Sequence, residues 1–270
     1  MPASPFSLEN KCAVVFGGAG YLGSATVQMM LDLGARVVIA DLFPDYTTEH
    51  IASFGAHPNC LLVHCDVSST QDVIKALQAG EEAFGRVNVM VNFAVYMGAA
   101  VADRVNLKGF SIESTSDADF DHSVRGVLGS SFRAIREAVP FLQKNKRSCI
   151  VNTSSMYGMV SPDPSIYGDS GQNNPVFYGA GKAGVLQLTR YAAAHLANKG
   201  IRVNCVTPGP FPAPRKLPPP DFMAKLSAKT MLGRVGQNQE IAGAYCYLIS
   251  DTATFTTGAN IVVDGGWTAW

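Results

Sequence analysis

The sequence has no excess of charge of either sign. Its 21 Lys and Arg residues balance its 21 Asp and Glu residues, so the formal net charge at pH 7 is +0. Proteins that attract nucleic acid or an anionic lipid surface usually carry a positive excess. The composition therefore argues against a nucleic-acid partner.

Long apolar runs and an export signal are also missing. No uninterrupted apolar stretch approaches membrane-spanning length, and the segment from Met1 to Phe6 lacks a basic region followed by an apolar one. These absences predict a cytoplasmic protein with no membrane partner. Hydrophobic residues make up 47% of the chain and charged residues 16%, which favours an oligomer over a lone monomer.

Metal-binding patterns are absent as well. The six cysteines contain no CxxC pair, and the five histidines show no ligand spacing. Three of the cysteines fall inside apolar runs that are typical of buried strands. We therefore expect reduced core thiols and no metal site.

Short runs rich in β-branched residues alternate with longer segments of helical periodicity. This alternation predicts βαβ units around a parallel sheet. The predicted strands are Cys12–Phe16, Arg36–Ala40, Leu61–His64, Val87–Asn92, Cys149–Thr153, Arg202–Val206 and Asn260–Val263. The predicted helices are Tyr21–Leu33, Ser69–Phe84, Asp117–Gln143, Val176–Asn198 and Gln239–Ile249. Because no linker divides the chain, residues 1–270 are predicted to form one Rossmann-like, doubly wound α/β domain.

Two irregular segments stand out. Residues 209–236 contain Pro210 and the triplet Pro218-Pro219-Pro220, which cannot fill a central strand or a helix interior. We interpret this segment as a mobile substrate lid. Residues 161–175 are rich in Pro, Asp, Ser, Gly and Asn, so they are predicted to form turns.

A glycine-rich turn follows the first predicted strand and opens the first predicted helix. It reads Gly17-Gly18-Ala19-Gly20-Tyr21-Leu22-Gly23. Glycine lets the backbone turn sharply and approach a pyrophosphate, which the N–H groups of the helix can then bind. Such a turn alone is a weak signal, but the strand before it and the helix after it strengthen the case. We expect Gly17, Gly20, Tyr21, Leu22 and Gly23 to hold a dinucleotide.

Asp41 ends the second predicted strand. A carboxylate at this position can accept hydrogen bonds from the adenosine ribose hydroxyls and repel a 2′-phosphate. Leu42, which follows, adds no basic group. The sequence therefore favours NAD over NADP.

Two further strand ends belong to the same predicted site. Asp66 and Val67 close the third strand, where the carboxylate can approach the adenine amino group or lead into the next helix. Both interpretations remain open. Asn92 and Ala94 close the fourth strand, where small residues let the backbone pass near the cofactor.

Three residues are candidates for the chemistry. Tyr178 and Lys182 lie four residues apart near the start of a predicted helix, so they share one face. An ammonium beside a phenol lowers the pKa of the phenol and can make it a base. Ser155 follows the fifth strand, where its hydroxyl can hold a substrate oxygen. We expect Ser155, Tyr178 and Lys182 to be the catalytic residues of an alcohol–ketone interconversion.

These residues resemble the short-chain dehydrogenase/reductase family, and the similarity covers nearly the whole chain. It rests on an ordered set: Gly17–Gly23, Ser155, Tyr178-x-x-x-Lys182, Pro208-Gly209, Thr257-Gly258 and Val263-Asp264-Gly265-Gly266. The resemblance implies that Lys182 also bonds the nicotinamide ribose and that Pro208 and Gly209 flank the nicotinamide, with Phe211 nearby. It also implies a homotetramer or a homodimer.

Several positions depart from the family pattern. Tyr21 replaces a common glycine, and Phe93 and Val95 replace Asn and Gly in the motif that closes the fourth strand. Ala213 lies near the position of the family's carboxamide-binding Thr. The helix that carries the family's catalytic Asn reads Val124 to Leu128 here and contains no Asn.

The interval between Ser155 and Tyr178 is longer than is usual in the family. The extra segment, 161–175, is predicted to lie at the mouth of the active site, and it carries polar side chains: Tyr167, Asp169, Gln172, Asn173 and Asn174. Polar groups there suit a sugar or sugar-like, polyhydroxylated substrate. The sequence therefore suggests a role in sugar metabolism.

Two other functions are compatible with parts of the pattern. The missing Asn and the altered motif after the fourth strand would suit an NAD-binding homologue without catalysis, with a regulatory or structural role. The glycine turn also resembles that of extended relatives that epimerise or dehydrate nucleotide sugars. Those relatives need a large C-terminal substrate domain, which we do not expect after Val263–Gly266.

Overall fold

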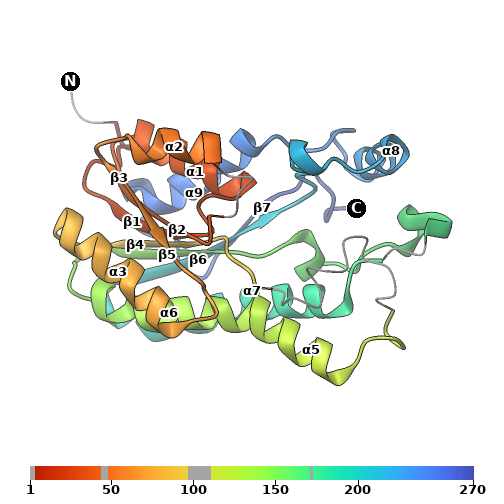
Figure 1. Cartoon of the computed structure of the whole chain (residues 1–270), viewed down its shortest axis with the longest axis horizontal. Helices are drawn as coiled ribbons and strands as arrows, with labels where there is room; N and C mark the ends of the chain where they lie inside the picture. Colours follow the sequence, from red (N-terminus) through yellow and green to blue (C-terminus); the bar gives the residue numbers. More distant parts are fainter. Residues whose placement is uncertain (1–3, 44–47, 97–110, 171–172) are drawn as a thin grey trace.

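The computed structural model describes residues 4–43, 48–96, 111–170 and 173–270. Seven strands form one parallel sheet in the order β3-β2-β1-β4-β5-β6-β7 (Figure 1). The strands are β1 (Cys12–Phe16), β2 (Arg36–Asp41), β3 (Cys60–His64), β4 (Val89–Asn92), β5 (Ser148–Thr153), β6 (Ile201–Pro208) and β7 (Asn260–Val263). The predicted doubly wound α/β fold is confirmed, with strand ends shifted by two residues or fewer.

The order of the strands reverses between β1 and β4. The chain runs outward from β1 to β3, then returns to start β4 on the other side of β1. In sheets of this kind the ligand crevice opens at the carboxyl ends of the strands at the reversal point. The glycine turn follows β1 directly, so it lies at this edge.

Helices cover both faces of the sheet (Figure 1). Helices α1, α2 and α9 lie on one face, and α3, α5, α6 and α7 lie on the other. Their bounds are α1 (Tyr21–Asp32), α2 (Thr48–Gly55), α3 (Thr70–Phe84), α5 (Asp117–Val124), α6 (Ser130–Leu142), α7 (Val176–Leu196) and α9 (Asn238–Ile249). Two buried apolar clusters, one on each face, join the helices to the sheet.

The ends of α3 follow from its sequence. The hydroxyl of Ser69 accepts a hydrogen bond from the backbone N–H of Asp72 at 3.3 Å and so caps the helix. Gly85 ends it in the left-handed region at φ +77°. The carboxylate of Asp72 accepts from the backbone N–H of Asp66, at 3.2 Å, which joins the helix to the end of β3.

The predicted helix Asp117–Gln143 is not continuous. A π-helical turn, Arg125–Gly129, separates α5 from α6. The hydroxyl of Ser130 donates to the carbonyl oxygen of Gly126 at 2.5 Å inside this turn. The wider turn places Val127 against Gly181 of α7, where a Cβ would lie 2.9 Å from the valine side chain. Periodicity alone could not reveal one extra residue in a turn.

The segment 209–236, predicted to be irregular, contains α8 (Pro220–Ala228). The triplet that argued against a helix lies at its start: Pro219 is the N-cap and Pro220 the first helical residue. Proline is tolerated there because the first N–H groups of a helix have no helical partner. The predicted turns in 161–175 are observed in part, as short 3₁₀ turns over Pro164–Ser170.

All six cysteines are free, and five are buried, so the prediction of reduced core thiols is confirmed. In the part of the chain that the structure describes, no helix has the length and apolar character needed to cross a membrane.

Candidate active site

The glycine turn closes tightly on itself and on the end of β4. Gly17 has φ +75°, and a Cβ on it would lie 2.7 Å from the backbone nitrogen of Ala94. A Cβ on Gly23 would lie 2.4 Å from the carbonyl oxygen of Gly17. Only glycine fits at these two positions. The turn thus leads straight into α1.

The start of α1 suits an anion. Its N-cap is Gly20, and no side chain caps the helix in the described structure. The first N–H groups of α1, beginning at Tyr21 and Leu22, therefore have no side-chain acceptor from the N-cap residue. This arrangement fits the pyrophosphate of a dinucleotide.

Asp41 is fixed beside the glycine turn. One carboxylate oxygen accepts from the backbone N–H of Ala19 at 2.9 Å, and the other accepts from that of Leu42 at 2.8 Å. An ionised carboxylate can accept about four hydrogen bonds, so capacity remains for ribose hydroxyls. Leu42 is half-exposed at the same strand end. The residues present fit an adenosine with a free 2′-hydroxyl.

The ends of β3 and β4 differ in character. The carboxylate of Asp66 accepts from the backbone N–H of Ser68 at 2.8 Å, as a residue that leads into a helix does, and Val67 is buried. The side-chain nitrogen of Asn92 donates to Ser131 at 2.9 Å. Its side-chain oxygen is buried and has no hydrogen-bond partner among the described residues, which leaves an acceptor at the end of β4.

Pro208, Gly209 and Phe211 lie at the end of β6. The backbone N–H of Gly209 donates to Val263 of β7 at 2.9 Å, and a Cβ on Gly209 would lie 2.5 Å from the Cα of Asp264. Phe211 packs against Gly236, which a larger residue could not replace. All three are therefore brought to the edge of the sheet that carries the glycine turn.

Ser155, Tyr178 and Lys182 are brought together. Ser155 follows β5 and hydrogen-bonds to the phenol oxygen of Tyr178 on α7. The ammonium of Lys182 lies 5.9 Å from the centroid of the Tyr178 ring and donates to the carbonyl oxygen of Thr153 at 2.8 Å. Ser155 and Lys182 are both buried. Sequence spacing did not reveal Thr153, because its carbonyl belongs to a different element.

Tight packing sets the distance between the turn after β5 and α7. A Cβ on Gly158 would lie 2.8 Å from the carbonyl carbon of Lys182, and one on Gly179 would lie 2.8 Å from the carbonyl oxygen of Tyr157. The backbones therefore touch at both positions. This contact holds Ser155 within reach of Tyr178.

Burial is the largest cause of the pKa shifts of Lys182 and Tyr178. Desolvation lowers the pKa of Lys182 to about 8. It raises the pKa of Tyr178, and the hydrogen bond from Ser155 acts in the opposite direction. The sequence predicted a Tyr178 pKa lowered by Lys182, and this is wrong for the chain by itself. The phenol packs among Val124 and Phe177, and the desolvation this causes outweighs the stabilisation of its charged form.

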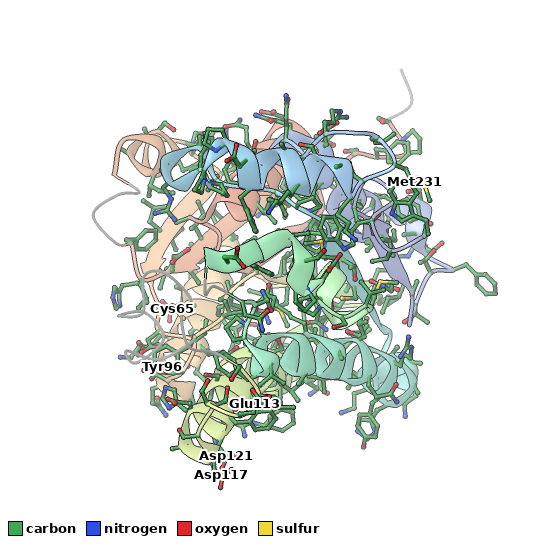
Figure 2. All side chains as sticks on the ribbon, turned by 90° about the vertical axis from the view of Figure 1, so that its right-hand side faces the viewer. Cys65, Tyr96, Glu113, Asp117, Asp121 and Met231 are labelled. Carbon is green, nitrogen blue, oxygen red and sulfur yellow. The ribbon has the colours of Figure 1, made fainter. Side chains whose placement is uncertain are left out.

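An aromatic cluster lies next to the turn after β5, and the sequence analysis missed it. We define it by Tyr157, Tyr167, Phe222 and Trp267. Figure 2 looks onto this edge of the molecule, with α8 above the segment 156–170 and α7 below it. The sequence offers one signal for this cluster, because Tyr157 lies two residues after Ser155. The other three come from segments far apart in the sequence.

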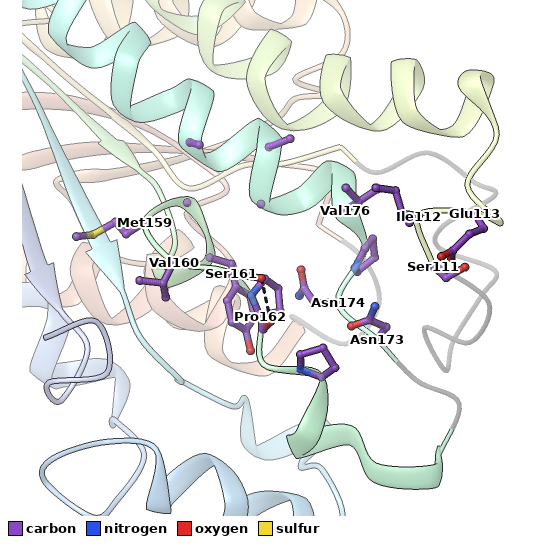
Figure 3. A pocket seen from close by; sticks show the side chains of 17 residues that line it. Ser111, Ile112, Glu113, Met159, Val160, Ser161, Pro162, Asn173, Asn174 and Val176 are labelled. Carbon is purple, nitrogen blue, oxygen red and sulfur yellow. Dashed lines mark hydrogen bonds between the residues drawn. The ribbon is translucent and has the colours of Figure 1, made fainter. Parts of the chain in front are cut away.

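Two of the polar residues of segment 161–175 line a cavity next to the turn after β5. Asn173 and Asn174 line a cavity of about 750 Å³, together with Glu113, Tyr157 and Gly179 (Figure 3). Ser155, Tyr178 and Lys182 do not line this cavity. Tyr167 packs against Phe222, and Gln172 lies outside the described residues. We refer to this space as the outer cavity.

A doubly wound sheet with a glycine turn, and a Ser, Tyr and Lys beside it, define a nucleotide-linked oxidoreductase. Residues 18–268 match a short-chain alcohol dehydrogenase family model described as Enoyl-(Acyl carrier protein) reductase. The chain belongs to the short-chain dehydrogenase/reductase family.

Known proteins resemble the chain over nearly its full length. The trans-4-hydroxycyclohexanecarboxylate dehydrogenase of Sinomonas cyclohexanicum is 33% identical, over 97% of this chain and 94% of that protein. A short-chain dehydrogenase of Leptospira borgpetersenii with bound NAD+ is 27% identical, with a TM-score of 0.79 over 98% of this chain and 95% of that one. The Pseudomonas aeruginosa RhlG/NADP active-site complex is 25% identical, with a TM-score of 0.83 over 99% of both chains.

Proposed function

We propose that the protein is an NAD-linked enzyme that interconverts a secondary alcohol and a ketone. The observation that carries this proposal is the assembly of Ser155, Tyr178 and Lys182 at the edge of the sheet that holds the glycine turn. The trio can hold a substrate oxygen and exchange a proton with it. When bound, the nicotinamide accepts or supplies the hydride.

The choice of NAD rests on Asp41. Its carboxylate is held beside the glycine turn by two backbone N–H groups, where it can bind ribose hydroxyls and repel a 2′-phosphate. Similar structures contain NAD+ in one case and NADP in another, so this residue decides the proposal.

Each residue of the trio has a separate role. The hydroxyl of Ser155 orients the substrate oxygen beside the phenol of Tyr178. Because burial raises the pKa of Tyr178, the phenol is protonated near pH 7, the state that donates a proton to a ketone. In the reverse direction the phenol must lose its proton first, and the positive charge of Lys182 favours that loss. The carbonyl of Thr153 fixes the lysine in place.

The substrate class predicted from sequence is a sugar or a sugar-like compound, and this stays a prediction. Its support is the polar content of the insertion, of which Asn173 and Asn174 line the outer cavity. A cytoplasmic homotetramer or homodimer likewise stays a prediction, based on the apolar composition and on the family.

The test is Tyr178→Phe, with Tyr191→Phe as the matched control. Tyr191 lies on the same helix and is exposed. We expect Tyr178→Phe to lower kcat by at least 100-fold with little change in the Kd for NAD, and Tyr191→Phe to change neither. The assay follows NAD reduction over a panel of simple secondary alcohols, sugars and sugar acids. Intact turnover in Tyr178→Phe would refute the proposed chemistry, and tight NAD binding without turnover of any alcohol or ketone would favour a non-catalytic homologue.

A further inference from the structure

The aromatic cluster is built from four separate segments of the chain. Tyr157 lies in the turn after β5, Tyr167 in the insertion, Phe222 on α8 and Trp267 after β7. The rings of Tyr157 and Trp267 meet edge to face, with centroids 6.3 Å apart and planes at 78°. Those of Tyr167 and Phe222 are 5.3 Å apart at 42°. Both arrangements are favourable contacts between aromatic rings.

Apolar side chains surround these rings. Met156, Ile166 and Leu226 are buried in the same cluster, and Met223 and Val235 pack against it. Trp267 is also buried, whereas the other three aromatic side chains keep part of their surface exposed. The cluster therefore presents a partly exposed apolar surface that packs on the buried side chain of Trp267.

Besides the Trp267 indole, the polar groups of the four aromatic side chains are two phenols, those of Tyr157 and Tyr167. These two phenols lie close enough for each to shift the pKa of the other. The backbone of Tyr157 contacts the residue that follows Tyr178, since a Cβ on Gly179 would lie 2.8 Å from the carbonyl oxygen of Tyr157. The aromatic cluster thus stands beside the proposed proton donor.

This surface suits some substrates and not others. A hydroxyl buried against apolar rings without a partner loses its hydrogen bonds to water, so a polyhydroxylated body would lose affinity here with each unpaired group. An apolar ring buries its whole surface favourably and stacks on aromatic faces.

Building on the proposed function, we propose that the aromatic cluster recognises the body of the substrate, and that this body is a compact apolar ring carrying the reacting alcohol or ketone. The phenol pair of Tyr157 and Tyr167 supplies one polar contact at its edge. This class competes with the sugar predicted from sequence, whose polar partners Asn173 and Asn174 line the outer cavity, to which Tyr157 of the aromatic cluster also contributes.

The test compares cyclohexanol, 2-propanol and sorbitol as substrates of the full chain with NAD. We expect wild type to prefer cyclohexanol to sorbitol by at least tenfold in kcat/KM. Phe222→Ala should lower the ratio of kcat/KM for cyclohexanol over 2-propanol about tenfold, mainly through KM, because the ring loses its contact. Phe222→Leu should lower it less. Phe132→Ala is the matched control, since Phe132 is exposed on α6.

Thermal unfolding of each variant separates lost recognition from lost folding. If Phe222→Ala is unstable, Tyr167→Phe, which removes only a hydroxyl, should still change the preference between ring alcohols with and without a second polar group. An unchanged ratio in folded variants, or a preference for sorbitol, overturns this inference and leaves the proposed function standing. Absence of NAD-linked turnover by wild type on every alcohol overturns both.

Discussion

Lys182 is a buried ammonium whose hydrogen-bond partner is a backbone carbonyl. Its pKa is lowered from 10.5 to about 8, because folding removes it from water. The cost of keeping it charged is therefore fully present below pH 8 and disappears as the pH rises toward 10.5. This free-energy cost to the folded state falls on the residue that lies beside Tyr178.

Lys182→Met should consequently stabilise the fold while it abolishes activity. We expect the free energy of unfolding at pH 7 to exceed that of wild type by roughly 1–3 kcal/mol, and the difference to shrink between pH 8 and pH 10.5. Urea denaturation at pH 7, 8, 9 and 10 measures this, with exposed Lys199→Met as the control. A difference that grows with pH would contradict the assigned direction of the pKa shift.

The preference for NAD over NADP can be tested by replacing one side chain, that of Asp41. Asp41→Ala should lower the ratio of NAD affinity to NADP affinity at least tenfold, because the repulsion of a 2′-phosphate and the ribose contacts both disappear. Titration of the variant with each dinucleotide measures the two Kd values. Asp66→Asn, at the neighbouring strand end, should leave the ratio near that of wild type. An unchanged ratio in Asp41→Ala would show that another group selects the cofactor.

Single residues could be assigned from the sequence where the evidence is local. Tyr178 and Lys182 are four residues apart on one helix, and Ser155 follows a recognisable strand, so the structure brings together the three residues that were expected. The pairing of Tyr157 with Trp267 depends on segments about a hundred residues apart and leaves no local pattern. The sign of the Tyr178 pKa shift also depends on burial, which one sequence does not give.

Helix α7 packs so closely on the π-helical turn that two of the glycines facing this turn have no room for a side chain. A Cβ on Gly181 would lie 2.9 Å from Val127, and one on Gly184 would lie 2.8 Å from Leu128. Both neighbours belong to the π-helical turn Arg125–Gly129. Glycine is normally the less stable choice inside a helix, so close packing explains its presence.

Matched glycine substitutions test this at the level of the helix. Gly243→Ala in α9, where a Cβ meets nothing within 4 Å, should raise the free energy of unfolding by about 1 kcal/mol. Gly181→Ala should lower it, because Val127 must move and Tyr178 and Lys182 move with the helix. Thermal and urea unfolding give the comparison, and the Gly181→Ala variant should also lose activity. Equal stabilisation by both changes would show that the helices are loosely packed.

Helices and strands were predicted well where the pattern of apolar residues is regular. They were predicted poorly where a proline or one extra residue in a turn interrupts that pattern. The strands were recognised because parallel sheets need continuous apolar runs. Helix α8 was missed because three consecutive prolines looked like a break, although proline is acceptable at the first helical position. The π-helical turn was missed because neither Gly126 nor Gly129 distinguishes it from an ordinary helix.

The molecule as a whole protects its thiols. Burial raises the pKa of Cys12, Cys65, Cys205 and Cys246 to about 12 and that of Cys60 to about 11. Since the thiolate is the reactive form, the native protein should react slowly with a thiol reagent at pH 8, and all six thiols should react at once in urea. The raised pKa values stabilise the fold below pH 9, and this contribution is lost as the pH rises toward 12. Rapid reaction of several thiols in the native protein would contradict the burial.

Lys229 connects three parts of the molecule that are distant in sequence. It follows α8, its ammonium pairs with Asp163 of segment 161–175 at 2.5 Å, and its carbonyl accepts from the indole of Trp270 at 3.2 Å. For a substrate or product to pass between these three segments, the Lys229–Asp163 ion pair and the Lys229–Trp270 hydrogen bond must both break. We therefore expect product release, rather than hydride transfer, to limit kcat, and we expect kcat to fall as added glycerol raises the viscosity of the solvent.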